Sequence, residues 1–179
     1  MRYIVKEFDK PLLIFSADMN SSNSNLQIEK IYEENDAFFP LNLTVSNGGL
    51  ESWLKHRVIP KNRAYVDALL SKTGLSANRP LGIIAVCKGL SLNDCYWVDS
   101  ADNESSFAKV NLYDNRFSTI LASIAFTGYG SSVRSSLFSS PEFSTNGMLP
   151  KCWRRINGKI YLYKGGTSGF SNTGFEPYS

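Results

Sequence analysis

The side chains best suited to bind an anion lie close to the end of the sequence. The pattern of residues 159–164 predicts a strand that ends at Lys164, ahead of two glycines. Because alternate side chains of a strand share a face, we expect Lys164 on the same face as Ile160 and Leu162. A lysine in that place can reach a bound phosphate while the aliphatic side chains form the wall of an adenine pocket.

A second anion-binding feature lies just upstream. Residues 145–151 predict a turn that contains Asn146 and Gly147 and ends at Lys151. Backbone N–H groups in such a turn can cradle an anion. The segment lacks the Gly-Lys-Ser/Thr ending of a Walker A loop, and it also differs from the glycine-rich loop of ordinary protein kinases.

Charge is distributed unevenly along a chain whose formal net charge is only +3. Residues 143–179 carry five basic side chains and one acidic one, and residues 51–79 carry six and two. Such segments suit an anionic partner, such as a phosphate group or a nucleic acid. A solvated basic hairpin would give the same pattern, so both interpretations stay open at this point.

A β-hairpin is the element expected to position these side chains. Asn157-Gly158 separates two short runs of strand-forming residues, 151–156 and 159–164. Asn-Gly readily adopts the positive φ angles that a tight type I′ turn needs.

The rest of the sequence predicts an α+β fold. Strands are expected at 3–5, 12–15 and 26–32, forming an N-terminal antiparallel sheet, and a further short strand at 96–98. Short helices are expected after a Ser46 cap, after an Asn62 cap with Tyr65 facing inward, from Pro80, and over 117–126 with an end at Gly128. The Gly/Ser-rich stretch 128–140 predicts a mobile linker between a domain over 1–127 and a segment over 141–179.

Composition narrows the classes of protein. A hydrophobic content of 42% in 179 residues is enough for a packed core. No apolar run approaches the ~18 residues of a membrane span, and the N-terminus is charged too early for a signal peptide, so we expect a cytoplasmic protein. The three cysteines form no CxxC pair and there is a single histidine, His56, so we expect reduced thiols and no zinc site.

Several segments together resemble a known family. They are 89–97, 140–153, 158–166 and the Glu-Pro-Tyr at 176–178. They look like the N-terminal part of bacterial HipA-like serine/threonine kinases, in a branch from Gram-positive bacteria. The match is close over 140–178, looser over the rest of 45–179, and adds little over the first 40 residues.

The resemblance implies roles for five residues. Asn146 and Gly147, through to Lys151, occupy the place of the family's phosphate loop. Lys164 matches the strand lysine that contacts the ATP phosphates, and Glu176 is expected to be the helix glutamate that partners it. The implied cofactor is ATP with Mg²⁺, and the C-terminal hairpin would be the start of the kinase small lobe.

The sequence departs from the family after Lys164. A kinase needs a catalytic aspartate and metal-binding asparagine and aspartate residues, and the 15 residues after Lys164 contain one acidic side chain, Glu176. We therefore expect this chain to be inactive alone, to bind ATP weakly or not at all, and to be cut off before the catalytic half. Its implied partners are the missing kinase lobe, in cis or in trans, and an antitoxin-like protein.

Two alternatives remain. The chain could be a free-standing module that binds a protein or a nucleic acid through its basic segments 51–79 and 143–164. Three short helices in a row also allow a helix-turn-helix interpretation, which we do not favour. An independent enzyme would need a nucleophile motif, and no Gly-x-Ser-x-Gly elbow is present.

Overall fold

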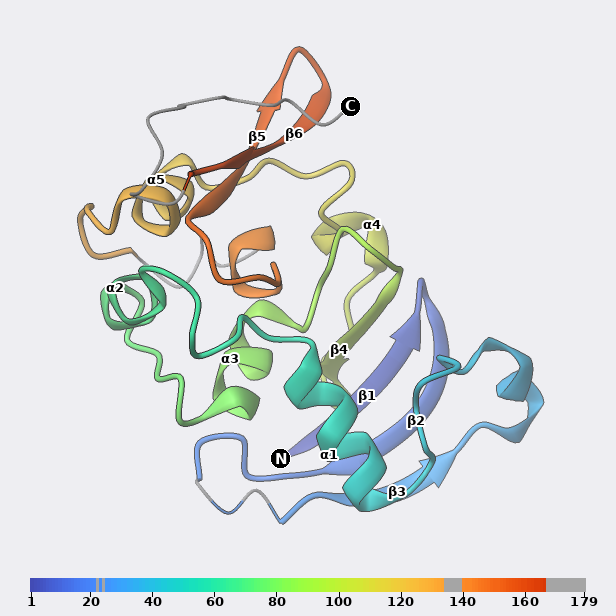
Figure 1. The fold of residues 1–179 in the computed structure, drawn as a ribbon. Coiled ribbons are helices and arrows are strands. Elements are labelled where there is room, and N and C mark those ends of the chain that lie inside the picture. The colour runs from blue at the N-terminus through green and yellow to red at the C-terminus, as the bar shows by residue number, and fades with distance from the viewer. Residues whose placement is uncertain (22, 24, 134–139, 167–179) are drawn as a thin grey trace.

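The protein has the α+β fold that the sequence predicts. The structure is a computed structural model that describes residues 1–21, 23, 25–133 and 140–166. It contains a four-stranded antiparallel sheet, several short helices and a separate two-stranded hairpin (Figure 1).

The N-terminal sheet includes the three strands expected near the start of the chain. Its strand order is β3-β2-β1-β4, and every neighbouring pair is antiparallel. The strand after residue 95 therefore joins this sheet at the edge beside β1, a pairing that the local pattern did not specify. The strands are β1 (Arg2–Glu7), β2 (Lys10–Ser16), β3 (Gln27–Ile31) and β4 (Tyr96–Ser100).

Side-chain alternation lets this sheet pack on both faces. Val5 and Val98 are partners across β1 and β4 and lie in the main hydrophobic core, under the helices. Their neighbours Lys6 and Trp97 point to the opposite face, where Trp97 packs with Phe107 in a smaller cluster. The two faces of the sheet thus serve two separate packing groups.

Helices and short 3-10 turns lie between β3 and β4 and after β4. They are η1 (Glu33–Phe38), α1 (Asn47–His56), α2 (Val66–Lys72), α3 (Pro80–Cys87), α4 (Phe107–Val110), α5 (Thr119–Thr127) and η3 (Pro141–Phe143). Among the described residues, no helix is long and apolar enough to cross a membrane.

Helix ends follow the local signals in most cases. The Ser46 side chain accepts a hydrogen bond from the backbone N–H of Gly49 and so caps α1. Pro80 occupies the first turn of α3, and Gly128 ends α5 with a φ of 78°. These three boundaries confirm the predictions made from sequence.

The start of α2 differs from its prediction. Tyr65, with a φ of 61°, is the N-cap residue, and no side chain caps this helix. Asn62 is therefore not the cap, and Tyr65 is 44% exposed instead of facing inward. The reason is packing: Val66, Leu69 and Leu70 reach the core from a helix that begins later than the cap motif suggested.

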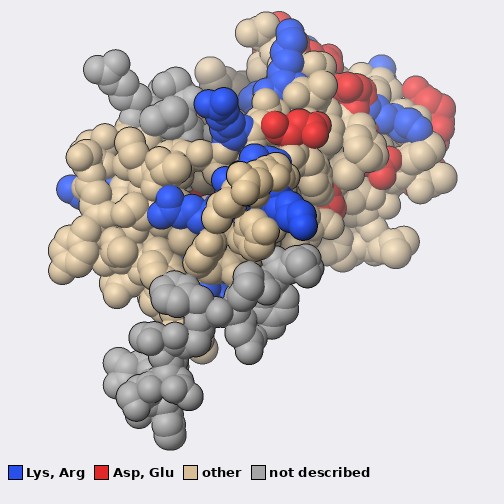
Figure 2. All heavy atoms as spheres, turned by 90° about the horizontal axis from the view of Figure 1, so that it is seen from above, with Lys and Arg blue, Asp and Glu red and all other residues tan. Residues whose placement is uncertain are grey.

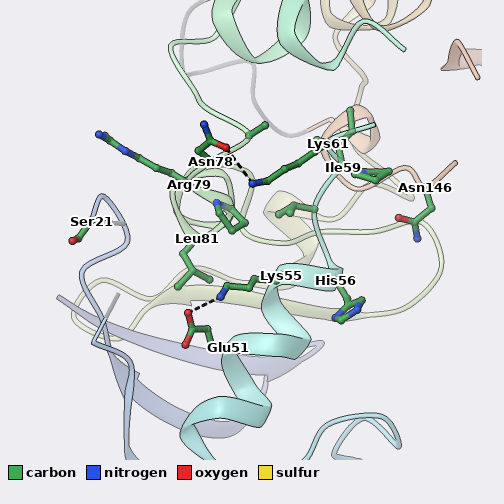
Figure 3. A pocket seen from close by; sticks show the side chains of 14 residues that line it. Ser21, Glu51, Lys55, His56, Ile59, Lys61, Asn78, Arg79, Leu81 and Asn146 are labelled. Carbon is green, nitrogen blue, oxygen red and sulfur yellow. Dashed lines mark hydrogen bonds and ion pairs between the residues drawn. The ribbon is translucent and has the colours of Figure 1, made fainter. Parts of the chain in front are cut away.

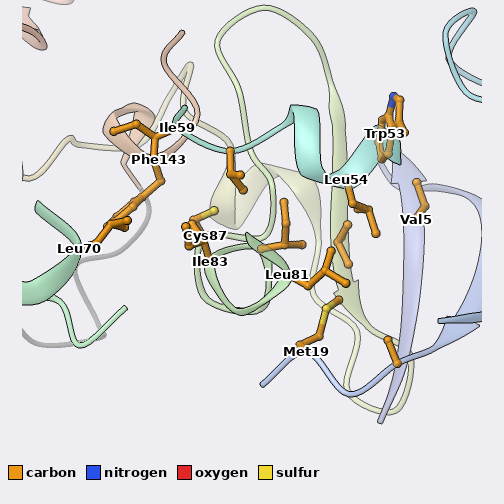
Figure 4. Close-up of a cluster of buried hydrophobic side chains, with 14 of the residues drawn as sticks. Val5, Met19, Trp53, Leu54, Ile59, Leu70, Leu81, Ile83, Cys87 and Phe143 are labelled. Atoms are coloured by element: carbon orange, nitrogen blue, oxygen red, sulfur yellow. The ribbon is translucent and has the colours of Figure 1, made fainter. Parts of the chain in front are cut away.

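The C-terminal segment packs into the same core as the N-terminal one. Phe143 in η3 is fully buried and lies beside Ile59 and Leu70 (Figure 4). The backbone N–H of Ile59 also donates to the carbonyl oxygen of Phe143 at 2.6 Å. The linker predicted at 128–140 lies partly outside the described residues, and the domain boundary there stays a prediction.

The predicted C-terminal hairpin is present. Its strands are β5 (Lys151–Ile156) and β6 (Lys159–Lys164), joined at Asn157 and Gly158 with φ angles of 49° and 80°. Positive φ at both central residues is what a type I′ turn requires. The hairpin stands above α5 and packs against it through β5 (Figure 1).

Candidate functional site

The hairpin places two lysines directly opposite each other. Lys151 begins β5, Lys164 ends β6, and the two are cross-strand partners. The next pair on the same face is Trp153 with Leu162. Lys164 is exposed, whereas Lys151 is only 8% exposed. This face therefore has an exposed lysine at one end and an aromatic–aliphatic pair behind it.

A closed turn precedes the hairpin and is held by its own lysine. The ammonium group of Lys151 donates a hydrogen bond to the carbonyl oxygen of Asn146 at 2.8 Å. Gly147 has a φ of 93°, and a Cβ there would collide with the same ammonium group. The indole N–H of Trp153 donates to the Thr145 hydroxyl at 2.7 Å. The turn is thus fixed at both of its ends.

Arg63 anchors this region from a distant part of the sequence. Its side chain is fully buried, and its guanidinium donates to the carbonyl oxygens of Glu142, Thr145 and Lys151, the last at 2.6 Å. These carbonyls lie on both sides of the turn. One arginine therefore ties η3, the turn and the first residue of β5 into a single unit.

A buried carboxylate completes the anchor. Glu142 is 1% exposed; it accepts a hydrogen bond from the backbone N–H of Trp153 at 2.8 Å and lies 3.5 Å from a guanidinium nitrogen of Arg63. Burial raises the pKa of Glu142 to about 7, although the Trp153 N–H and Arg63 both act in the opposite direction. Glu142 is therefore poorly placed to neutralise further cations.

Positive charge is in excess around the turn. Burial, together with the charges of Arg63 and Lys164, lowers the pKa of Lys151. Seen from the hairpin side, basic side chains spread across the middle of the surface and acidic ones gather toward one side (Figure 2). The turn and hairpin thus form a region where an anion would be electrostatically favoured.

A small cavity opens on the same face of the hairpin. It has a volume of about 250 Å³. Trp153 and Leu162 form its apolar side and Asn146 lies on its polar side. Its remaining lining residues are Ser91, Leu92, Asn93, Pro141, Ser144 and Thr145. The cavity offers a flat apolar wall next to hydrogen-bonding groups, as binding sites for small organic molecules commonly do.

Four of the five residues predicted for the site can be placed. Asn146, Gly147 and Lys151 lie together in the turn, and Lys164 lies across the hairpin from Lys151. Glu176 lies outside the described residues. The face shared by Ile160, Leu162 and Lys164 is as the strand alternation predicted, while the nucleotide-binding roles of these residues stay predictions.

The residues that hold the turn in place were not predicted from the sequence. Arg63 carried no local signal, because arginine is usually exposed. A weak sign was available for Glu142, which is the last acidic residue before a stretch of 33 residues without one. An isolated acid at the edge of a basic segment is a reasonable candidate for an internal ion pair.

The donor set of the site meets only part of the needs of ATP and Mg²⁺. Lys164 and the cavity are suited to a phosphate group and part of a base. Mg²⁺ prefers several oxygen ligands, and Glu142, the carboxylate that the described residues place beside the turn, is directed toward Arg63 and the Trp153 N–H. Within the described part of the chain, no group of three or more His, Cys, Asp or Glu residues is placed to hold a metal ion. These residues do not fit Mg²⁺ by themselves.

No family model matches the chain, and neither the search of curated proteins nor the search of solved structures found a match.

Proposed function

We propose that this chain supplies an N-terminal interaction region and the first hairpin of the nucleotide-binding lobe of a HipA-like serine/threonine kinase. In this proposal the face with Leu162 and Lys164 lies toward the nucleotide. The turn at Asn146 and Gly147 lies toward its phosphates. The chain contributes binding and docking, and is not catalytically competent by itself.

One observation carries the proposal: two lysines are paired across a hairpin, and a third cation, the buried Arg63, lies beside them. Like charges directly opposite in an antiparallel pair are destabilising, by up to ~1 kcal/mol. Lys151 and Lys164 are such a pair, and Arg63 adds to the positive potential at Lys151. A bound polyphosphate would relieve this repulsion. The lysine pair, which lowers stability in the free chain, would then serve to bind the ligand.

The two lysines take different parts in this arrangement. Lys151 is committed to the Asn146 carbonyl and holds the turn, so it acts as a positioning residue. Lys164 is exposed at the strand end and is the cation that can contact phosphate oxygens. The Trp153–Leu162 pair supplies an apolar surface for the base.

The expected partners follow from the catalytic groups that the described residues do not supply. Phosphoryl transfer requires metal ions between the β- and γ-phosphates and a carboxylate that orients the acceptor hydroxyl. The described residues do not supply these groups, so they would come from a catalytic lobe that docks in cis or in trans. An antitoxin-like protein is the second proposed partner, on the basis of the family resemblance alone.

Substitution of Lys164 tests the proposal in a protein that includes the catalytic lobe. Lys164→Ala should abolish incorporation of labelled phosphate from ATP without lowering the unfolding temperature, because an exposed strand-end side chain contributes little packing and its removal relieves the repulsion with Lys151. Lys159→Ala is the matched control, since Lys159 is an exposed lysine at the other end of the same strand. Full activity of Lys164→Ala would refute the nucleotide-binding role.

The isolated chain gives a second test. It should bind ATP weakly or not at all, because the described residues supply no set of ligands for the Mg²⁺ that accompanies ATP. Calorimetry that gave a dissociation constant in the range of about 1 μM, equivalent to about −8 kcal/mol, would contradict the view that the site is incomplete.

A second candidate function rests on a different part of the hairpin. A cavity of about 660 Å³ between α5 and β5 combines basic side chains with aromatic rings. They are Arg116, Arg154 and Arg155 with Phe117, Phe126, Trp153 and Tyr163. This composition is typical of single-stranded nucleic acid sites, where bases stack on aromatic rings.

A salt titration decides on this second candidate. Binding of a fluorescent oligo(dT) should weaken steeply with increasing salt if several phosphates are neutralised. Absence of measurable binding at low salt would exclude it, whatever the result for ATP.

A further inference from the structure

A second basic pocket lies at the end of α1, next to the turn that precedes the hairpin. It has a volume of about 430 Å³, within the size range of small-molecule sites. It is built from the end of α1, the chain that follows it, and the start of α3 (Figure 3). Its lining residues are Ser21, Glu51, Lys55, His56, Val58, Ile59, Pro60, Lys61, Ala77, Asn78, Arg79, Pro80, Leu81 and Asn146.

Two lysines extend into this pocket from opposite walls. Figure 3 shows the Lys55 and Lys61 side chains extending in the same direction, Lys55 toward Glu51 and Lys61 toward Asn78. Lys55 forms an ion pair with Glu51 at 2.8 Å, and Lys61 donates to the Asn78 side-chain oxygen at 3.1 Å. The ammonium groups are therefore held in the pocket by local contacts before any ligand binds.

Positive charge exceeds negative charge in the pocket wall. Glu51 is the one carboxylate in the lining, against Lys55, Lys61 and Arg79. Among the described residues, neither Lys61 nor Arg79 lies within ion-pair distance of a carboxylate. After Lys55 and Glu51 cancel, two cations remain for a ligand.

The beginning of α3 adds to this positive potential. The helix runs from Pro80 to Cys87, Arg79 is its N-cap residue, and no side chain caps it. The positive end of the helix dipole therefore faces the pocket without a neutralising acid in the first turn. This contribution reinforces the charge of the two cations, which carry the argument.

The floor of the pocket is apolar and belongs to the packed core. Val58, Ile59 and Leu81 line it and are each at least nine-tenths buried as part of the main core. A ligand that filled the space would place an anionic group near Lys61 and Arg79 and an organic group on these side chains. The pocket thus favours an anion that carries an apolar or ring-shaped part.

We propose that this pocket binds a small phosphate monoester. A phosphate dianion matches the two surplus cations, whereas a carboxylate would match only one of them. The site is separate from Lys164, so the proposal does not depend on the proposed nucleotide site. Asn146 lines both this pocket and the hairpin cavity, which makes the turn the point where the two sites meet.

His56 provides a direct readout. It is the single histidine of the chain and it lines the pocket, so its ring signals in an NMR spectrum belong to one known position. We expect phenyl phosphate to shift these signals in a saturable manner. Benzoate, with the same ring and one negative charge, should bind about tenfold more weakly, because it leaves one cation unmatched.

Matched variants separate this pocket from the hairpin site. Lys61→Gln and Arg79→Gln should each weaken phenyl phosphate binding about twofold to fivefold, as expected for loss of a charged contact at an exposed site. Lys164→Gln should leave it unchanged. Both pocket residues are exposed, and an unaltered thermal unfolding curve will show that the variants fold.

Three results would overturn the proposal. They are the absence of a saturable His56 shift, equal affinities for phenyl phosphate and benzoate, and a loss in Lys164→Gln that matches the loss in Lys61→Gln. The last result would move phosphate binding to the hairpin. It would leave the nucleotide-site proposal intact, so the two proposals can fail independently.

Discussion

Two buried carboxylates, one in the N-terminal sheet and one beside the C-terminal hairpin, both lie near cations, but their pKa values are shifted in opposite directions. Asp99 in β4 is 2% exposed and Glu142 in η3 is 1% exposed. Burial raises the pKa of both. In Asp99, hydrogen bonds from Lys88 and from the Ser105 backbone N–H outweigh burial, and the pKa lies below its usual range. In Glu142 burial dominates, and the pKa rises to about 7.

The difference lies in how many donors are aimed at each carboxylate. Asp99 accepts from Lys88, from the Ser105 N–H at 2.6 Å and from the Ser105 hydroxyl at 3.2 Å, and Lys6 lies 3.9 Å away. Glu142 accepts one short bond, from the Trp153 N–H, while Arg63 directs its donors at backbone carbonyls. A nearby cation therefore stabilises the ionised form of a buried acid only when the N–H groups of the cation point at the carboxylate.

The buried cations around the N-terminal sheet are thus paired with acids, whereas the turn before the C-terminal hairpin has a surplus of positive charge. Lys6, Arg57 and Lys88 each pair with an acid within their own part of the fold. Lys151 instead donates to a carbonyl oxygen and has Lys164 opposite it. This contrast favours the hairpin side over the N-terminal sheet as a place where an anion can bind.

Removal of the arginine anchor should give the largest effect. Arg63→Met removes the partner of three buried carbonyls and leaves Glu142 without its counter-cation, so we expect a loss of about 4 kcal/mol in the free energy of unfolding. Urea unfolding monitored by tryptophan fluorescence measures it. Arg79→Met, at an exposed arginine, should change stability by less than about 0.5 kcal/mol. A loss below about 1 kcal/mol for Arg63→Met would show that other contacts hold the turn.

Neutralising the well-bonded carboxylate should cost somewhat less. Asp99→Asn weakens the partnership with Lys88 and Lys6, although Lys6 keeps Glu104 at 2.5 Å, so we expect a loss of about 3 kcal/mol at neutral pH. Because the pKa of Asp99 is lowered in the folded state, its contribution is present above about pH 3.8 and is lost as pH falls through the folded pKa. The gap between wild type and variant should therefore close in acid.

An exposed acid in the same region is the control for that experiment. Asp102 forms a 3.6 Å pair with Arg2 and its side chain is 67% exposed. Asp102→Asn should leave the unfolding free energy unchanged at every pH. An equal loss in the two variants would mean that net charge, not the donors around Asp99, sets the stability.

The second carboxylate should show the opposite dependence on pH. The pKa of Glu142 rises from 4.5 to about 7 on folding, so its contribution to stability is fully present below about pH 4.5 and is lost as pH rises through 7. We expect a fall on the order of 2 kcal/mol in the wild-type unfolding free energy over this range. Glu142→Gln cannot ionise and should flatten the curve. A variant curve parallel to wild type would assign the fall to another group.

The sequence could predict those parts of the fold that depend on local chemistry. Asn157-Gly158 fixed the hairpin turn, Ser46 capped α1 and Gly128 ended α5, because each feature is decided by a few neighbouring residues. The placement of β4 beside β1 joins residues about 90 positions apart, and no local pattern encodes it. The α2 start failed for the same reason, since core packing overrode the cap motif at Asn62.

The candidate site shows the same division. The turn at Asn146 and Gly147 and the face of Lys164 follow from backbone preferences and from strand alternation. The burial of Arg63 and Glu142 depends on the docking of η3 against the chain after α1, which only the folded structure reveals. The different uses of Lys151 and Lys164 also follow from geometry, because the two residues are chemically identical.

The smallest expected effect tests how the turn is held. Gly147→Ala combines a positive φ with a collision against the Lys151 ammonium group, whereas Gly158→Ala has a positive φ of 80° and nothing within 4 Å. Both variants should lose about 1 kcal/mol from backbone strain, and Gly147→Ala should lose somewhat more. In a double-mutant cycle, Lys151→Met should remove that excess, because the collision partner is gone. Equal losses at the two glycines would mean that Lys151 moves aside freely. The Asn146 carbonyl contact would then be dispensable for the turn.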